Sequence, residues 1–295
     1  NVVTGILIAI LVAGVIFGGI KRIGLVAGRI VPLMVLIYLL GGVGILIKNY
    51  DKLGSVFNLI FSDAFTGNAV VGGVVGEVIR QGIRRAVFSN EAGLGTEVMA
   101  HGAAKTKEPV REGLVAMLGP FIDTLIICTM TGLVILSTGA WKHTQFFVNI
   151  TATSAEEARQ AIELGVFQGR ELFNSSLLTS FAFKDGLSFL FNFGDKIVTV
   201  SVLLFAVSTA IAWSFYGNRS AVYLFGEKAI LPYLWIYVLF VFIGGIAELE
   251  AIWAFGDAAL GIMTFPNLIS IVLLTGALKG MTKEYFSKEH VPYQK

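Results

Sequence analysis

Apolar residues occur along this chain in long continuous windows that are separated by short polar segments. Seven windows of roughly 20 residues are each long enough to cross a bilayer core of about 30 Å; they cover approximately 2–20, 23–47, 54–79, 113–138, 191–217, 229–248 and 252–278. Backbone groups in lipid must bond within their own segment, so continuous windows predict helices rather than the alternating strands of a barrel. The pattern predicts an all-α integral membrane protein with about seven transmembrane helices.

Composition supports this class, because 55% of the residues are hydrophobic and only 14% are charged. Soluble domains are roughly 45–50% apolar and about 25% charged. The net charge of +2 is uninformative, and the single Cys128 cannot form an internal disulfide. No nucleic-acid partner is expected. The chain opens inside an apolar window, at NVVTGILIAILVAG, so we expect a fragment that lacks an N-terminal part.

Basic residues predict the orientation in the membrane. Most of the 22 Lys and Arg residues fall in alternate connections when the segment 21–29 is assigned to the inside. Cytoplasmic loops carry such an excess, so the C-terminal tail 279–295 is expected in the cytoplasm of a prokaryote and the 139–190 segment outside. In that segment, TSAEEARQAIELG (153–165) has Ser154 and Glu157 at the spacing of a capping box, with Gly165 as a stop. It predicts a short surface helix with a stripe of Ala158, Ile162 and Leu164, either at the external mouth or in a solvated loop.

The third window is unusually rich in glycine. The run DAFTGNAVVGGVVGEV (63–78) includes Asn68, Gly72 and Gly73, and glycine weakens a helix. One reading is a helix interrupted at the midplane, whose freed backbone groups bind a substrate or a cation. The other reading is close helix packing through small residues, since Gly72 and Gly76 are four apart.

The fifth window carries hydroxyls and a large aromatic residue in mid-helix. Ser208 and Thr209 are adjacent, and Thr209 shares a face with Trp213 one turn later. Two hydroxyl oxygens with backbone carbonyls suit a monovalent cation, and Trp213 could wall a small pocket. The alternative is that both hydroxyls bond to carbonyls of their own helix.

Two acids, Asp123 and Asp257, lie within windows, where charged residues are costly and are functional candidates. Pro120 loosens the helix before Asp123, and Asp257 is close enough to the outer boundary to be solvated. Glu77 is expected to pair with Arg80 or Arg84. The three histidines all lie in connections, and no phosphate loop is visible, so enzyme chemistry is not indicated.

The polar connector FSNEAGLGTEVMAHGAAKTKEPVRE (88–112) identifies a family. The order SNEAGLG, AHGAAKT, PVREGLVAMLG and FIDTLIICT, followed later by AVSTAIAWSFYGNRS, resembles the sodium:alanine (or glycine) symporter family of bacteria and archaea over essentially all 295 residues. This resemblance implies a leucine-transporter-like fold of two inverted five-helix repeats, each with a broken first helix.

The resemblance divides the chain into regions. Residues 1–53 would be the last two helices of the first repeat, and 54–278 the whole second repeat. The latter would include the broken helix 54–79, a cytoplasmic link 80–112 at the inner gate and the extracellular loop 139–190. The first repeat's broken helix would lie outside this chain.

The resemblance also implies roles for particular residues. Ser208 and Thr209 would bind the coupling sodium ion, and Asp123 with Thr124 could support a second ion site. The substrate, a small neutral amino acid such as alanine or glycine, would contact Trp213, Thr209, Gly72, Gly73, Asn68 and Val71. We expect sodium-coupled symport by a monomer in the plasma membrane, without organic cofactors. The alternatives are coupling to a proton, another small amino acid, or an inactive membrane fragment or scaffold.

Overall fold

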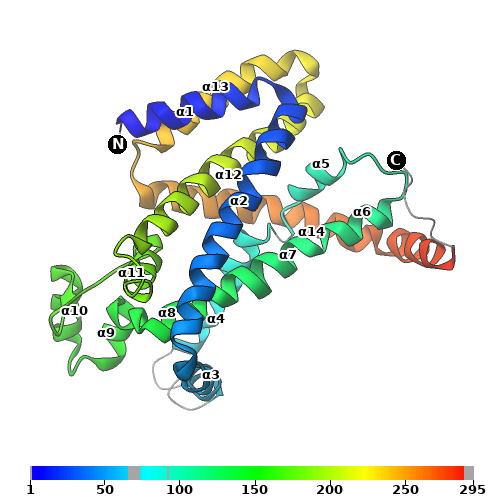
Figure 1. Ribbon diagram of the computed structural model, residues 1–295. Coiled ribbons are helices and arrows are strands. Elements are labelled where there is room, and N and C mark those ends of the chain that lie inside the picture. The colour runs from blue at the N-terminus through cyan, green and yellow to red at the C-terminus, as the bar shows by residue number, and fades with distance from the viewer. Residues whose placement is uncertain (1, 66–73, 92, 289–295) are drawn as a thin grey trace. The chain divides into compact units, whose positions relative to one another are not determined.

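The computed structural model describes residues 2–65, 74–91 and 93–288, and it is almost entirely helical (Figure 1). The longer helices are α1 (Val2–Ile16), α2 (Gly19–Lys48), α3 (Tyr50–Phe65), α4 (Val74–Ser89), α12 (Gly194–Phe225), α13 (Ile230–Gly244) and α14 (Leu249–Ser287). The shorter ones are α5 (Glu97–His101), α6 (Pro109–Ala116), α7 (Leu118–Pro120), a π-helix (Phe121–Cys128), α8 (Thr129–Thr138), α9 (Gln145–Thr151), α10 (Ala155–Leu164) and α11 (Ser176–Gly186). Two 3₁₀ turns, Ala140–His143 and Glu227–Ala229, and the antiparallel pair β1 (Val166–Phe167) and β2 (Arg170–Glu171) complete the described elements.

Within the described residues, five helical segments are long and apolar enough to cross a membrane. They are Gly19–Lys48, Pro109–Thr138, Gly194–Phe225, Glu227–Gly244 and Ala251–Ser287. The predicted window 2–20 corresponds to α1, which has 15 residues and is a shorter apolar helix. The window 54–79 falls on α3 and α4, which are described over 16 residues each. These five segments are consistent with an integral membrane protein, while a count of seven transmembrane helices stays a prediction.

Helix α4 continues ten residues beyond the predicted end of its window, as far as Ser89. Its charged residues are accommodated because α14 supplies partners for them. Arg84 forms an ion pair with Asp257, and the Arg85 guanidinium lies 4.8 Å from the centre of the Trp253 ring. The expectation that Asp257 is simply solvated was therefore wrong, since its side chain is only 19% exposed and is paired.

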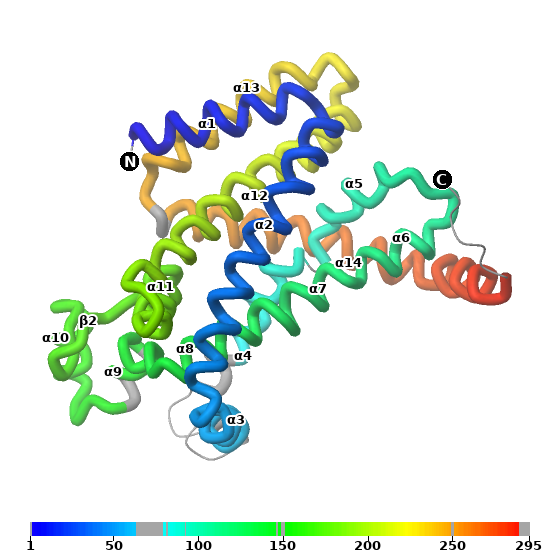
Figure 2. Tube along the Cα trace, viewed as in Figure 1, coloured from blue at the N-terminus to red at the C-terminus, as the bar shows by residue number. Residues whose placement is uncertain are grey.

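The chain forms two compact units, and the first comprises residues 1–27, 82–123 and 209–295. In it, α1 and α13 lie side by side (Figure 2). Glycines bring the two backbones together, because a Cβ on Gly245 would be 2.8 Å from the Cα of Gly5. Phe17 and Trp235 pack at one end of this contact, with ring centres 5.0 Å apart. Both helices otherwise expose large apolar side chains, as expected for surfaces that face lipid.

The second unit comprises residues 28–81 and 124–208. Its hydrophobic core joins α2, α8, α11 and the beginning of α12, and it contains Ile45, Met130, Val134, Phe183, Leu187 and Val198. Small residues again permit close approach, since a Cβ on Gly186 would meet Ile45 at 2.8 Å. A hydrogen bond of 2.8 Å between Tyr38 Oη and Thr131 Oγ1 also joins α2 to α8.

The capped surface helix predicted at 153–165 is confirmed as α10. Ser154 Oγ accepts a bond from the Glu157 amide at 3.2 Å, and Glu157 Oε2 accepts from the Thr153 amide at 2.8 Å. The hydrogen bonds from Thr153 also lower the pKa of the Glu157 carboxyl. Gly165 ends the helix with a φ of +68°. Leu164 is 78% exposed, so its predicted place in the apolar stripe was wrong.

Candidate functional site

The most distinctive backbone of the first unit is the loop 90–96, which follows α4 and carries most of the SNEAGLG motif. Gly93 and Gly95 both have a φ of +78°, a left-handed conformation that glycine adopts without steric cost. Glu91 has a φ of +49°, which is uncommon for a residue with a side chain. Such a conformation costs on the order of 1–3 kcal/mol and persists where the surrounding contacts impose it.

The contacts that hold Glu91 come from its own loop and from α12. The indole Nε1–H of Trp213 donates to Glu91 Oε1 at 2.8 Å. The hydroxyl of Thr96, which is only 2% exposed, donates to the other oxygen, Oε2. Both carboxylate oxygens therefore have a donor, and one of these donors lies 122 residues further along the chain.

The glycines of the loop pack against α14. Asn267 Nδ2 donates to the carbonyl of Gly93 at 2.9 Å. A Cβ on Gly95 would lie 2.7 Å from Asn267 Oδ1, so glycine is also required there for space. Leu94 points inward and is 4% exposed. The loop is thus fixed by α12 on one side and by α14 on the other.

These contacts place the loop beside the middle of two long helices. Trp213 is 19 residues from the beginning of α12, and Asn267 is 18 residues from the beginning of α14, whose lengths are 32 and 39 residues. The place of the connector at the inner gate, which the family resemblance implies, stays a prediction. Within a membrane, irregular backbone is tolerated where protein buries it or where it lines a cavity, and transporters build binding sites from it.

A second polar contact lies next to the loop. Ser89 Oγ, at the end of α4, donates to Asp123 Oδ2 at 2.5 Å. Asp123 belongs to the π-helix that follows directly after Pro120, the place where the sequence predicted a loosened helix. Proline lacks an N–H and disturbs the α-helical ladder, and π-helical turns are frequent at functional sites. Asp123 is therefore held by a hydroxyl at the beginning of a non-α segment.

The predicted ion ligands are placed as follows. Ser208 is buried, and its hydroxyl donates to the Phe205 carbonyl at 2.9 Å, which is the alternative that the sequence left open. Thr209 follows it in α12 and is half-buried. The division between the two units falls between Ser208 and Thr209, and likewise between Asp123 and Thr124. The structure brings Trp213 and Asp123 each into contact with the motif at 89–95.

Four predicted substrate residues, Asn68, Val71, Gly72 and Gly73, lie outside the described residues. Sequence reasoning did not single out Glu91, Thr96 or Asn267. The available signals were a carboxylate among small residues between apolar windows, and an amide within the last window, in TFPNLIS. Both are polar groups that need partners at membrane depth.

The connector beyond the loop carries a histidine between two acids. His101, at the end of α5, is 2.6 Å from Glu112 Oε1 through Nδ1 and 3.3 Å from Glu97 Oε1 through Nε2. The hydrogen bond with Glu112 raises the pKa of His101 above its ordinary value, and Glu97 adds to this effect. A protonated imidazole can thus join α5 to α6.

Comparison with known proteins gives this geometry a context. The model of the family described as "Sodium:alanine symporter family" matches residues 1–294. The chain is 39% identical to the sodium/alanine symporter AgcS of Methanococcus maripaludis, over 96% of this chain and 56% of that protein. It is 37% identical to an uncharacterized transporter of Haemophilus influenzae, over 97% of this chain and 57% of that protein.

A third relative is the sodium/proton-dependent alanine carrier protein of Bacillus sp. strain PS3. It is 31% identical over 97% of this chain and 61% of its own length. The chain therefore spans a little over half the length of these curated relatives.

Proposed function

This chain belongs to the sodium:alanine symporter family, and we propose that it serves sodium-coupled symport of a small neutral amino acid, alanine first, across the plasma membrane. The sequence family and the five apolar helices identify a multi-pass membrane transporter. The substrate is proposed from the names of two relatives, which both specify alanine.

The observation that supports this proposal most directly is the bond between Trp213 and Glu91. Trp213 is the residue proposed to line the substrate pocket. A pocket wall selects side-chain size only if its position is fixed, and a hydrogen bond from the indole to a carboxylate fixes the ring. The same bond connects that wall to the loop 90–96, so a change in the loop would move the indole ring that is proposed to line the substrate pocket.

Sodium is proposed to bind through Ser208 and Thr209. A hydroxyl has one donor and two acceptor lone pairs. Because the Ser208 hydroxyl already donates to the Phe205 carbonyl, its oxygen presents lone pairs to a cation. The bond within the helix is therefore compatible with the ion site. Thr209 would contribute to both ion and substrate sites, and Asn68, Val71, Gly72 and Gly73 would complete the substrate contacts.

Asp123 and Thr124 are proposed as a second ion site. The hydrogen bond from Ser89 orients the Asp123 carboxylate. A carboxylate in this position also suits proton coupling, the runner-up mechanism, and one relative is named a sodium/proton-dependent carrier. The two mechanisms predict different ion requirements for uptake.

The architecture is proposed to be a leucine-transporter-like inverted repeat with about seven transmembrane helices in this chain. Residues 1–53 would end the first repeat and 54–278 would form the second. Helices α3 and α4 would be the two halves of the broken helix. Alternating access would then be driven by the sodium gradient, in which one charge moving through 100 mV supplies about 2.3 kcal/mol.

Radiolabelled alanine uptake into proteoliposomes that carry the full-length protein tests this function. We expect uptake with an inward sodium gradient and none when potassium replaces sodium. Equal uptake with both cations, together with an increase under an inward proton gradient, would show that the coupling ion is a proton and not sodium. Absence of uptake from folded protein under every gradient would refute alanine as the substrate, and glycine, serine and D-alanine would be tested next.

A further inference from the structure

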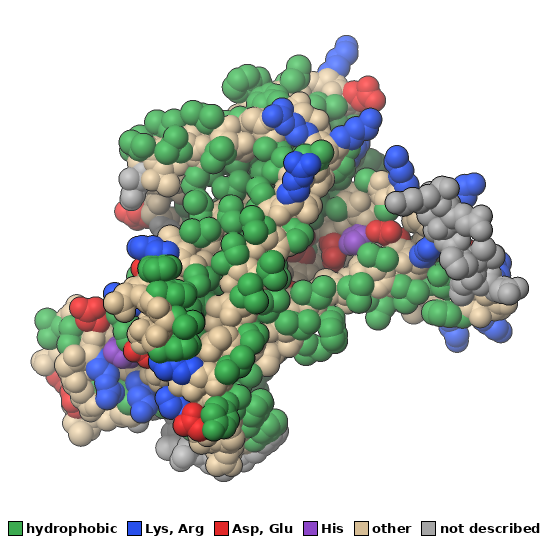
Figure 3. All heavy atoms as spheres, in the orientation of Figure 1, with side chains coloured by type: hydrophobic (Ala, Val, Ile, Leu, Met, Phe, Trp, Pro, Cys, Tyr) green, Lys and Arg blue, Asp and Glu red, His purple; other side chains and the backbone are tan. Residues whose placement is uncertain are grey.

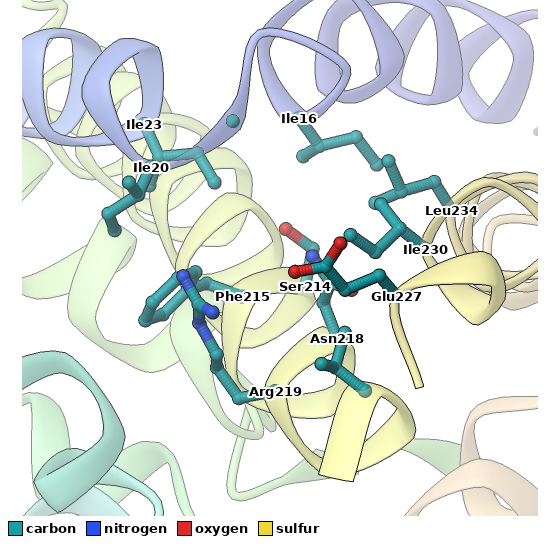
Figure 4. Close-up of a pocket in the computed structure, with 12 residues that line it drawn as sticks. Ile16, Ile20, Ile23, Ser214, Phe215, Asn218, Arg219, Glu227, Ile230 and Leu234 are labelled. Atoms are coloured by element: carbon teal, nitrogen blue, oxygen red, sulfur yellow. The ribbon is translucent and has the colours of Figure 1, made fainter. Parts of the chain in front are cut away.

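A pocket opens in the first unit at the end where α1 meets α2 and α12 meets α13. Its volume is about 220 Å³. Drug-sized ligands occupy sites of roughly 300–1,000 Å³, so this pocket suits a smaller group. One wall is apolar and is formed by Ile16, Ile20, Ile230 and Leu234. Figure 4 shows these side chains around one side of the pocket and polar side chains on the other.

The polar side carries two opposite charges. Arg219, on α12, and Glu227, in the 3₁₀ turn before α13, both line the pocket. The Arg219 guanidinium lies 4.8 Å from the centre of the Phe215 ring. Among the described residues, Arg219 and Glu227 form no ion pair with each other or with another side chain. Figure 4 shows the Glu227 carboxylate extending toward α12, where Arg219 stands. The pocket is thus lined by a cation and an anion that, within the part of the chain that the structure describes, are not joined in an ion pair.

The same pocket is also lined by an amide whose oxygen has no hydrogen-bond partner among the described residues. Asn218 lines the pocket, and its Oδ1 is shut off from solvent without a hydrogen-bond donor in the part of the chain that the structure describes. Buried polar atoms are nearly always paired, so such an atom calls for an explanation. Rotation of the amide about χ2 would turn Oδ1 toward an N–H donor that enters the pocket. Ser214, the deepest polar residue, is 1% exposed and already donates to the Ile211 carbonyl.

The surroundings of the pocket combine an apolar surface with basic residues. Lys21 and Arg22, in the first turn of α2, and Lys228, in the 3₁₀ turn before α13, are exposed at this end of the unit. Figure 3 shows Lys and Arg side chains gathered at this end, next to hydrophobic side chains that cover α1 and α13. Helix ends with this composition lie at the boundary between hydrocarbon and headgroups.

We infer that this pocket binds a small zwitterion with an ammonium group and an anionic group, its ammonium at Glu227 and Asn218 and its anionic group at Arg219. A purely anionic ligand would meet the uncompensated Glu227 carboxylate. A quaternary ammonium has no N–H to donate to Asn218. The headgroup of an ethanolamine phospholipid has the required chemistry, with its acyl chains on the apolar wall, and so does a free amino acid.

Native mass spectrometry of the purified full-length protein in detergent tests this site. Dioleoyl phosphatidylethanolamine, phosphatidylglycerol and phosphatidylcholine are titrated separately, and the fraction of protein with one retained lipid is measured. Glu227→Gln and Arg219→Gln should each weaken retention of phosphatidylethanolamine by about tenfold, since charge-assisted hydrogen bonds contribute on this scale. Lys228→Gln and Arg22→Gln are controls for the loss of a charge, because both residues are exposed at the same end of the unit and do not line the pocket. Unchanged thermal unfolding of each variant verifies that the fold is retained.

Competition identifies the source of the zwitterion. If millimolar O-phosphoethanolamine or alanine does not displace the lipid, an ethanolamine phospholipid is the ligand. If either displaces it in the parent protein but not in Glu227→Gln, a free zwitterion is the ligand. Equal retention of all three lipids, or retention that is unaffected by Glu227→Gln, would overturn the inference. None of these outcomes depends on whether sodium drives uptake.

Discussion

Replacing Trp213 by Phe removes one N–H donor while it keeps a large aromatic ring in α12. The lost bond, 2.8 Å from indole Nε1 to Glu91 Oε1, is a hydrogen bond to a carboxylate, and such bonds contribute about 1.5–3 kcal/mol. The left-handed backbone of Glu91, with its φ of +49°, costs a similar amount, on the order of 1–3 kcal/mol. The bond is therefore large enough to decide whether the loop 90–96 keeps its conformation.

A double-mutant cycle with Trp213→Phe and Glu91→Gln measures this coupling. Unfolding free energies of the four proteins in detergent should give an interaction energy of about 1.5–3 kcal/mol. Hydrogen exchange of the Leu94 amide, which donates to the Glu91 carbonyl at 3.1 Å, should accelerate in each single variant. Trp235→Phe is the control, because Trp235 is 64% exposed on α13 and its ring contact with Phe17 can be kept by phenylalanine.

An interaction energy below about 0.5 kcal/mol, the usual error of additivity, would refute the reasoning. The same conclusion would follow if Trp235→Phe accelerated exchange at Leu94 as much as Trp213→Phe does. In either case the loop would be held by its glycines and by Asn267, and the indole bond would be incidental.

Three further changes test other contacts. Gly95→Ala should destabilise the protein by about 1–3 kcal/mol, because its φ of +78° is unfavourable for alanine and the new Cβ would be 2.7 Å from Asn267 Oδ1. The control is Gly113→Ala, whose new Cβ would meet no atom within 4 Å. If thermal unfolding showed that both variants are as stable as the parent protein, this prediction would be wrong. The hydrogen bond to Glu112 raises the pKa of His101. The protonated His101 therefore stabilises the folded protein fully below the unfolded pKa of about 6.5, and this contribution is lost as pH rises through the higher folded pKa. His101→Gln should abolish that part of the pH dependence of Tm, and an unchanged pH profile would count against the ion pair. Thr209→Val should raise the sodium concentration for half-maximal uptake several-fold, and an unchanged value would remove Thr209 from the proposed ion site.

Local patterns predicted the parts of this structure that depend on near neighbours. The helix at 155–164 followed from Ser154, Glu157 and Gly165, which act within one or two turns of each other. The long helices followed from apolar windows, because lipid leaves a backbone few other conformations. The predicted window ended before the end of α4, because its arginines suggested a polar connection. In the structure these residues are helical, and Arg84 forms an ion pair with Asp257 on α14.

The site depended on contacts that local patterns do not contain. The Trp213 indole and the Glu91 carboxylate are 122 residues apart, and Asn267 reaches Gly93 across 174 residues. The sequence did indicate Trp213 as a candidate pocket residue and the SNEAGLG motif as a mark of the family. It gave no reason to place them in contact, since pairing across such separations is decided by how the helices pack. The predicted ion and substrate roles stay predictions.

The contact between Asn267 and the loop has a mechanical consequence that follows from the length of α14. At 1.5 Å per residue, its 39 residues extend about 58 Å, nearly twice the bilayer core of about 30 Å. The portion from Asn267 to Ser287 is a rod of about 30 Å, so a tilt of roughly 10° at the loop would swing its far end by about 5 Å. Lys279 and Lys283 lie one turn apart on this rod. A small change of packing beside Gly93 would thereby move the positive charges of Lys279 and Lys283 sideways.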